Sequence, residues 1–427
     1  MAGDINRTID AVWRIEQAKV IAGLTRIVRD VGVAEELAQD ALVAALKQWP
    51  ESGVPNNPGA WLMQAGKHRA IDTLRRRTRV EQKHEEIGRE LAELEQTTPD
   101  LDTALDDHVG DDLLRLVFIS CHPILSTEAR VALTLRLLGG LTTEEIARAF
   151  LMAEATVAQR IVRAKRTLAE AKVPFEVPRG EEMASRLSSV LEVIYLIFNE
   201  GYSATSGKDW MRPELCQEAL RLGRIVAELA PNEPEVHGLV ALMEIQASRL
   251  RARVSPTGEP ILLLDQDRSR WDQLLIRRGF AALLRADETG RPLGPYALQA
   301  AIAACHARAR LADDTDWKRI ADLYGALMEV SPSPVIELNR AVAVGMAFGP
   351  AEGLKIVDQI AGEPSLKSYY ILPTVRGDLL EKLGRRDEAR AEFERAAALT
   401  KNERERTVLL GRAAGAAAQP ANGGTSG

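Results

Sequence analysis

The chain has 427 residues, of which 46% are hydrophobic and 27% charged, and its formal net charge is −6. This length allows about two to four domains, and the acidic balance excludes a nonspecific nucleic-acid coat, which would be basic. No apolar run is long enough to cross a membrane and the N-terminus lacks a secretion-signal pattern, so we expect a cytoplasmic protein with no membrane partner.

Apolar residues recur at helical spacing along nearly the whole chain, and no alternating strand pattern is convincing. The sequence therefore predicts an all-α fold. Its first part is a helical domain over residues 8–79, with one helix over 33–46 and another over 60–77. Trp49-Pro50 is expected to end the earlier helix, and a loop rich in Pro, Gly and Asn follows at 51–59.

The charge changes sign between two neighbouring segments. Residues 67–79 carry six Lys or Arg and one acid, whereas residues 81–112 carry twelve acids and two bases. This reversal suggests a DNA-facing surface followed by an acidic connector, which we place at 80–108. A disordered tether is equally compatible with the composition of the connector.

A helix-turn-helix is predicted within a second domain, residues 109–173. Hydroxyl and acidic residues at 142–145 are typical of a helix start, a break follows at 151–154, and a second helix begins near Ala155. Its inner face is apolar at Val157, Ile161, Ala164 and Leu168. Its outer face carries Thr156, Gln159, Arg160, Arg163 and Arg166. Such a helix fits the major groove, although an ordinary helix pair with a solvated basic face shows the same periodicity.

A long helical array is predicted over 181–412, after a proline-containing hinge at 174–180 and before a small-residue tail at 413–427 that we expect to be disordered. The array shows a repeat near 34 residues. Its last copy is Gly377, Ala389, Phe393, Ala396 and Lys401, at relative offsets 0, 12, 16, 19 and 24. Weaker copies include Ala341, Gly353, Val357 and Ile360. This pattern resembles the tetratricopeptide repeat and implies a helical solenoid with a concave binding surface.

The residues do not indicate a metal site, a cofactor or an enzyme. The three cysteines lie far apart and form no metal-ligand spacing, so neither a zinc site nor a disulfide framework is suggested. Nucleotide-binding, zinc-protease and serine-hydrolase motifs are missing from the sequence. The string at 199–202, Asn-Glu-Gly-Tyr, is better explained as a helix end at Gly201 than as a catalytic site.

Two segments together resemble one family. Residues 30–50 and 58–77 resemble region 2 of extracytoplasmic-function (ECF) sigma factors, and the helix-turn-helix resembles their region 4. Residues 181–412 resemble the tetratricopeptide extension of one subgroup, in which segments like 195–202 and 265–272 recur. The resemblance implies a promoter-specificity subunit of RNA polymerase, with region 2 on the −10 element and region 4 on the −35 element.

The resemblance also assigns roles to individual residues. The residues matching the helix that binds core polymerase are Glu36, Leu37, Gln39 and Asp40. Those matching the −10 element contacts are Asn56, Asn57, Lys67, Arg69, Arg75 and Arg76. Without the resemblance, the first set would be a plain solvated helix face. Trp61 is expected in the core and not in a base stack.

This sequence departs from the family at three positions. His68 stands where Asn is usual, Ala158 where Lys is frequent, and Leu151 where the turn has Gly. Because leucine is disfavoured at positive φ, the turn at 151 should take another geometry.

The predicted function is promoter-specific transcription initiation with core RNA polymerase and promoter DNA as partners. The C-terminal extension is expected to regulate it, with a regulatory protein as a further partner on the tetratricopeptide-like domain. The alternative is a repeat-containing helix-turn-helix activator that never replaces the housekeeping sigma factor. An activator has no need for a polymerase-binding helix or a basic −10 helix, so the N-terminal domain favours the sigma factor.

Overall fold

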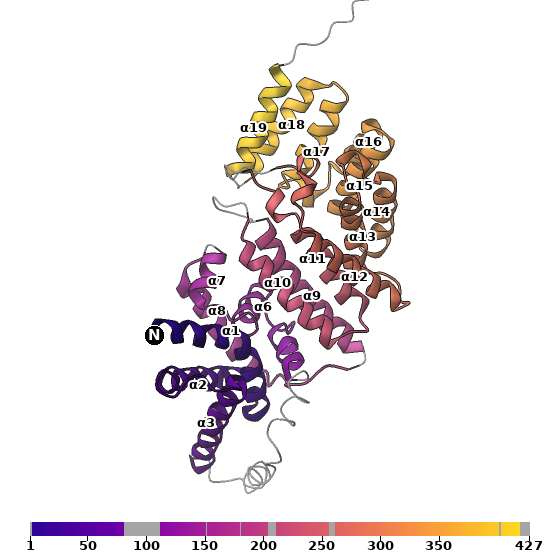
Figure 1. The fold of residues 1–427 in the computed structure, drawn as a ribbon. Coiled ribbons are helices and arrows are strands. Elements are labelled where there is room, and N and C mark those ends of the chain that lie inside the picture. The colour runs from indigo at the N-terminus through magenta and orange to yellow at the C-terminus, as the bar shows by residue number, and fades with distance from the viewer. Residues whose placement is uncertain are drawn as a thin grey trace, which may run out of the picture. The chain divides into compact units, whose positions relative to one another are not determined.

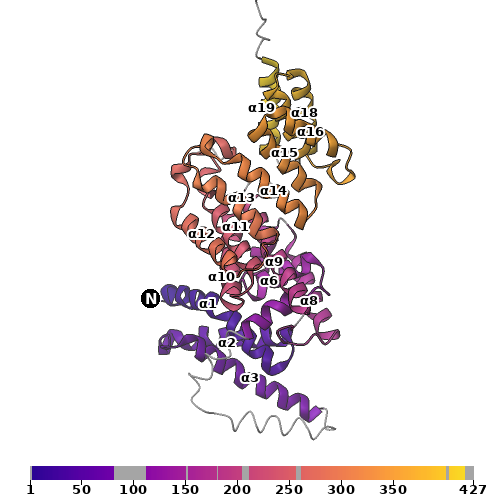
Figure 2. The same cartoon turned by 90° about the vertical axis from the view of Figure 1, so that its right-hand side faces the viewer.

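A computed structural model describes residues 2–80, 112–150, 152–179, 181–203, 211–255, 261–400 and 403–418. Across these ranges the secondary structure is helical and contains no β-strand, which confirms the all-α prediction. The chain forms two compact units, Met1–Leu196 and Ile197–Gly427, whose helices are shown in Figures 1 and 2. The predicted connector at 80–108 lies outside the described ranges except for its first residue.

The N-terminal unit contains two helical groups. The first is α1 (Ala2–Val28), α2 (Val31–Ser52) and α3 (Pro58–Val80). The second is a helix at 112–120, α6 (Thr127–Leu137), α7 (Thr143–Ala149) and α8 (Glu154–Glu170). The first part of α9 (Glu181–Tyr202) completes the unit.

The α1–α3 group packs its three helices against one another. Gly66 on α3 allows close contact with α1, because a Cβ there would lie 2.8 Å from a methyl carbon of Leu24. Helix α2 begins after Asp30, whose carboxylate accepts the backbone N–H groups of Gly32 and Val33 at 2.8 and 3.0 Å. The prediction that Trp49-Pro50 ends this helix is wrong. Buried Trp49 anchors the last turn of α2, which continues to Ser52, and Gly53 caps the helix at φ 80°.

The helix-turn-helix forms as predicted. Thr142 and Glu145 build a reciprocal capping box at the start of α7, in which each side chain accepts the other residue's backbone N–H. Helix α8 buries the four predicted inner residues, Val157, Ile161, Ala164 and Leu168, each at most 5% exposed. The unusual turn residue, Leu151, lies outside the described part of the chain.

The first half of α9 belongs to the N-terminal unit, so the two compact units do not divide at the predicted hinge, 174–180, but between Leu196 and Ile197. Arg186 donates to the carbonyl of Phe118 at 3.3 Å, and the Ser189 hydroxyl donates to the carbonyl of Cys121 at 2.7 Å. Arg130 on α6 also pairs with Glu192 at 3.0 Å. These contacts are long-range, which is why local composition at the prolines misplaced the boundary.

The C-terminal unit continues as consecutive helices. They are α10 (Pro213–Leu229), α11 (Pro234–Ala247), α12 (Gln273–Glu288), α13 (Pro295–Arg308), α14 (Trp317–Val330), α15 (Pro334–Phe348), α16 (Pro350–Ile360), α17 (Ile371–Lys382), α18 (Arg386–Leu399) and α19 (Glu403–Ala418). Short 3₁₀ turns lie at Leu250–Ala252, Leu263–Asp265, Arg268–Arg270, Ala312–Asp314 and Pro364–Leu366. Because α19 runs to Ala418, the prediction of a disordered tail from 413 is wrong for its first residues; residues 419–427 are not described.

The residues of the predicted repeat lie where helices approach closely. A Cβ on Gly377 would lie 2.7 Å from the ring of Phe393, and one on Gly353 would lie 2.6 Å from the carbonyl oxygen of Ala341. Ala389, Phe393 and Ala396 are fully buried. The small residues therefore allow α17 to contact α18 and α15 to contact α16, as the spacing predicted.

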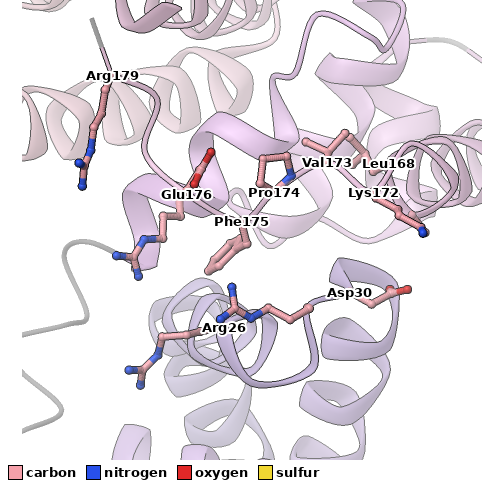
Figure 3. Close-up of a pocket in the computed structure, with 12 residues that line it drawn as sticks. Arg26, Asp30, Leu168, Lys172, Val173, Pro174, Phe175, Glu176 and Arg179 are labelled. Atoms are coloured by element: carbon pink, nitrogen blue, oxygen red, sulfur yellow. The ribbon is translucent and has the colours of Figure 1, made fainter. Parts of the chain in front are cut away.

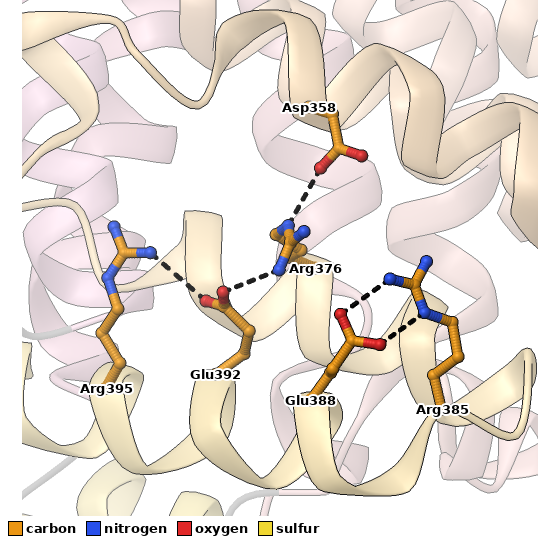
Figure 4. A network of polar contacts seen from close by, with 6 residues as sticks. All are labelled: Asp358, Arg376, Arg385, Glu388, Glu392 and Arg395. Carbon is orange, nitrogen blue, oxygen red and sulfur yellow. Dashed lines mark hydrogen bonds and ion pairs between the residues drawn. The ribbon is translucent and has the colours of Figure 1, made fainter.

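Polar side chains tie α16, α17 and α18 together outside the core (Figure 4). Arg376 contacts Asp358 of α16 and Glu392 of α18, both at 2.9 Å. Glu392 also accepts from Arg395 at 3.3 Å. Asp358 and Arg395 are about half exposed, and their pairs should each contribute about 0.2–1 kcal/mol to stability. Glu392 is only 13% exposed, so its pair with Arg376 is less screened by water.

The two motifs at 195–202 and 265–272 meet in an arginine and aromatic cluster. The guanidinium of Arg253 lies 3.5 Å from the ring centroid of Tyr202, and Arg268 lies 5.0 Å from that of Trp271. Arg249 lies between the two rings, at 5.8 and 5.7 Å. Such stacking stabilises cations that burial would otherwise penalise, so these motifs have a structural role in the C-terminal unit.

Candidate nucleic-acid and polymerase interface

The predicted −35 residues lie along the outer face of α8. Thr156, Gln159 and Arg163 are exposed and Arg160 is half-buried. The same four residues line a shallow cavity of about 360 Å³ beside the start of α6. Arg166 is 70% exposed and pairs loosely with Glu170 at 3.4 Å. The fold therefore leaves this face of α8 accessible while its opposite face anchors the helix.

The neighbouring turn adds groups that sequence reasoning missed. Ser126 caps α6 by accepting the backbone N–H of Ala129 at 3.3 Å, and it lines the same cavity. The pKa of Glu128 is lowered by hydrogen bonds from the backbone N–H of Glu128 and from the Ser126 hydroxyl, with a smaller contribution from the charge of Arg160. The signal available in the sequence was Ser126-Thr127-Glu128, which is typical of a helix start.

In the loop and helix predicted to contact the −10 element, some side chains also make contacts within the fold. Asn56 and Asn57 are both exposed, but the Asn57 side chain caps α3 by accepting the N–H of Ala60 at 3.0 Å. Trp61 packs edge-on against Trp49, with ring centroids 5.3 Å apart. The indole is therefore engaged in a packing contact, although Trp61 is half-buried and not part of the buried core.

The basic residues of α3 differ in exposure. Lys67 is half-buried, Arg75 is exposed, and the side chain of Arg76 lies outside the described part of the chain. Arg69 is 40% exposed and pairs with Asp40 of α2 at 3.0 Å. This ion pair joins a residue predicted to contact DNA with one predicted to contact polymerase.

One member of the predicted polymerase-binding set is misplaced. Glu36, Gln39 and Asp40 are exposed on α2, whereas Leu37 is only 6% exposed. Leu37 shares the buried face of the helix with Ala34, Ala38 and Ala41 and packs inside the unit. The assignment of Leu37 to a binding surface is therefore wrong for this conformation.

The two helical groups of the N-terminal unit are joined by ion pairs that the sequence did not predict. The Glu35 carboxylate on α2 accepts from Arg136 Nε of α6 at 2.7 Å and also pairs with Lys165 of α8. Its side chain is 6% exposed. A second buried carboxylate, Asp112, pairs with Arg26 of α1 at 3.0 Å. Both contacts are long-range, so no local pattern reveals them.

The described residues offer little for metal or thiol chemistry. None of their His, Cys, Asp or Glu side chains form a group of three or more that could hold a metal ion. The three cysteines are free and buried, and burial raises the pKa of Cys121 to about 11. Among the described helices, none is long and apolar enough to cross a membrane.

The catalytic alternative at 199–202 has a structural explanation. Glu200 pairs with Arg212, and a Cβ on Gly201 would lie 2.6 Å from the backbone nitrogen of Cys216. The string therefore closes the end of α9 against the start of α10.

Comparisons with known proteins agree with this arrangement. Residues 13–80 match the model of sigma-70 region 2, and residues 115–168 match that of sigma-70 region 4. The chain therefore carries both sigma-70 regions, which supports its role as a sigma factor. As a sigma factor it is a transcription initiation factor that binds core RNA polymerase and promoter DNA, and it is not an enzyme.

Relatives extend the picture to the whole chain. An uncharacterized protein of Rhizobium meliloti (strain 1021) is 43% identical over 415 residues, which is 97% of both chains. The two proteins therefore belong to one family. The ECF RNA polymerase sigma factors SigK of Mycobacterium sp. strains KMS and JLS are 27% identical over 155 residues, covering 35% of this chain and 76% of theirs. Residues 186–287 match a family of unknown function (DUF6596). No solved structure matches.

Proposed function

We propose that this sigma factor is of the ECF type, acts in the cytoplasm, and is regulated by its C-terminal helical unit. The observation that supports the proposal is that region 2 and region 4 lie in one chain with a long helical unit, an organisation shared end to end with the Rhizobium relative. The likeness of regions 2 and 4 to the mycobacterial ECF factors supports the subgroup.

For the −35 element, we propose that α8 enters the major groove with Thr156, Gln159, Arg160 and Arg163 toward the bases and Arg166 toward phosphate. Arg160 is central because it is half-buried in the cavity lining, where its guanidinium donates to the sulfur of Met152 at 3.6 Å. Arg160→Ala should weaken −35 binding by roughly 1–3 kcal/mol and relax preference at one base pair. The measurement is binding to a library of −35 sequences; an unchanged base preference would reject the assignment.

For polymerase, we propose a contact through Glu36, Gln39 and Asp40 on the exposed face of α2. For the −10 element, we propose Asn56, Asn57 and the basic side chains of α3, Lys67, Arg69, Arg75 and Arg76. The Asp40–Arg69 pair must then open on binding. Because both side chains are substantially exposed, opening costs only about 0.2–1 kcal/mol.

The polymerase contact can be tested with a charge reversal. Asp40→Arg should impair co-purification with core polymerase while leaving the helix content unchanged. Glu51→Arg is the matched control, since Glu51 is an exposed acid on the same helix outside the proposed contact. Normal co-purification of the Asp40 variant, or equal loss in both variants, would contradict the assignment.

We further propose that the C-terminal unit is a tetratricopeptide-like solenoid that regulates the sigma regions and offers a surface to a regulatory protein. The close glycine contacts of α15–α16 and α17–α18 support the repeat. The test is transcription by core polymerase with the full chain and with a truncation after Tyr202. Ending at Tyr202 keeps the α9 contacts of Arg186 and Ser189, which a cut at the hinge prolines would remove.

The same assay separates the two functional hypotheses. Transcription from a matching promoter by core polymerase and this protein alone is the expected result. Activity only when another sigma factor is added would favour the activator. Identical activity of the full chain and the truncation would reject regulation by the C-terminal unit.

A further inference from the structure

A cavity of about 630 Å³ lies inside the N-terminal unit, where region 2, region 4 and the segment after α8 meet. Figure 3 shows Arg26 and Asp30 on one wall, with Pro174, Phe175 and Glu176 across from them. This volume is within the range of small-molecule sites, roughly 300–1,000 Å³. None of the contacts proposed for DNA or polymerase uses this cavity.

Basic side chains dominate its lining. Five cations line the cavity: Arg26, Arg29, Arg115, Lys172 and Arg179. The lining acids are Asp30 and Glu176. The Asp30 carboxylate is occupied in capping α2. Of the cations, Arg26 and Arg115 share the one carboxylate of buried Asp112, at 3.0 and 2.7 Å.

Three of these cations have no ion-pair partner among the residues that the structure describes. Within the described part of the chain, Arg29, Lys172 and Arg179 make no ion pair and no side-chain hydrogen bond. They come from three places: the end of α1, the end of α8 and the segment that follows it. The helix dipoles also contribute: the C-terminal ends of α1 and α8 carry partial negative charge that offsets some of the positive charge, whereas the N-terminal end of α2 carries partial positive charge that adds to it.

The backbone gives a second, independent observation. Arg29 has φ 56° and Lys172 has φ 48°, and among the described residues other than glycine these are the two with positive φ. Glycine would adopt this conformation without strain. Backbone strain that persists at a cavity often serves ligand binding. Both positions follow helix ends, where this conformation is common, and both place a long cationic side chain at the same cavity.

We propose that this cavity binds a small phosphorylated compound carrying at least two phosphate groups. Arg29 from region 2 and Lys172 from region 4 hold it from opposite sides, and Arg179 adds a third contact. Guanidinium groups match phosphate oxygens in charge and in fork geometry. Because the bound compound touches both regions, it fastens region 2 to region 4.

The test is calorimetric titration of the full-length protein with inorganic tripolyphosphate, ATP and adenosine. Tripolyphosphate and ATP should bind and adenosine should not. Arg29→Ala and Lys172→Ala should each weaken tripolyphosphate binding by about tenfold or more, since each removes a charged hydrogen bond. Arg310→Ala, at an exposed arginine of the C-terminal unit, should leave it unchanged.

A second variant guards against misfolding. Arg29→Gly removes the same charge and relieves the positive φ, so it should fold at least as well as the wild type and still lose binding. Absence of tripolyphosphate binding in the wild type, or equal affinity in the wild type, Arg29→Gly and Lys172→Ala, would overturn the proposal. The titration requires no polymerase or promoter, so its outcome is independent of the proposed transcriptional role.

Discussion

Two ion pairs on helix α2 should differ sharply in strength because their environments differ. Glu35 is 6% exposed and its partner Arg136 is 24% exposed, whereas Asp40 and Arg69 are 60% and 40% exposed. Water screens the second pair but hardly reaches the first. Removing Arg136 leaves the buried Glu35 carboxylate with Lys165 in place of two cationic partners, so the Glu35–Arg136 coupling should be about 2 kcal/mol. The Asp40–Arg69 coupling should be about 0.2–1 kcal/mol.

The perturbations are two double-mutant cycles, Glu35→Gln with Arg136→Met and Asp40→Asn with Arg69→Met. Hydrogen exchange of the α2, α3 and α6 amides measures the local free energy of opening in the intact chain. The cycle then isolates each pair from the cost of the single substitutions. The second cycle is a matched control because it alters the same helix and the same kinds of charge.

The reasoning makes a further distinction by salt. Added salt should reduce the Asp40–Arg69 coupling and leave most of the Glu35–Arg136 coupling in place, since buried charges are screened less. Equal couplings in the two cycles would refute the argument. So would a Glu35–Arg136 coupling below about 0.5 kcal/mol, because the interface between regions 2 and 4 would then be held by something other than this carboxylate.

Three further outcomes are expected. Gly377→Ala should cost about 1–3 kcal/mol by forcing a Cβ to 2.7 Å from a buried phenylalanine ring, whereas Gly411→Ala, with open space around it, should be neutral or stabilising in thermal unfolding. Ile161→Ala should cost about 2–5 kcal/mol and weaken DNA binding, while Val162→Ala, 63% exposed, should change the unfolding free energy by less than about 0.5 kcal/mol. Burial, with Arg249 and Arg268 contributing less, lowers the pKa of His306 from 6.5 to about 3. Between pH 6.5 and pH 4 the unfolded chain therefore binds a proton at His306 that the folded chain does not bind. Acidification to pH 4 should lower the free energy of unfolding by up to about 3 kcal/mol, and His306→Gln should lack that loss in the same pH series.

Local patterns predicted the helices well. The four apolar residues of α8 and the capping residues of α7 act within one or two turns, so their spacing carries the information. The glycine contacts of the last repeat were also visible, because small residues recur at a fixed period. Element ends were less predictable: burial of Trp49 extends α2 past Pro50, and α19 runs into the expected tail.

The candidate site was predictable only in part. Periodicity identified the exposed face of α8, since its buried face is plainly apolar. It did not separate Leu37 from the polar residues beside it on α2, because the family match supplied positions and not orientations. Nor did it reveal that Asn57 caps α3, that Asp40 pairs with Arg69, or that Glu35 pairs with cations on two helices more than a hundred residues away.

The sequence by itself determined the helical class, the presence of regions 2 and 4, and which side of α8 faces outward, since each follows from residues close together in the chain. Tertiary structure alone decided which charges meet. Glu35 with Arg136 and Lys165, Asp112 with Arg26, and the basic cavity around Arg29 and Lys172 all join segments distant in sequence. Electrostatic contacts depend on distance and burial in space, and spacing along the chain encodes neither.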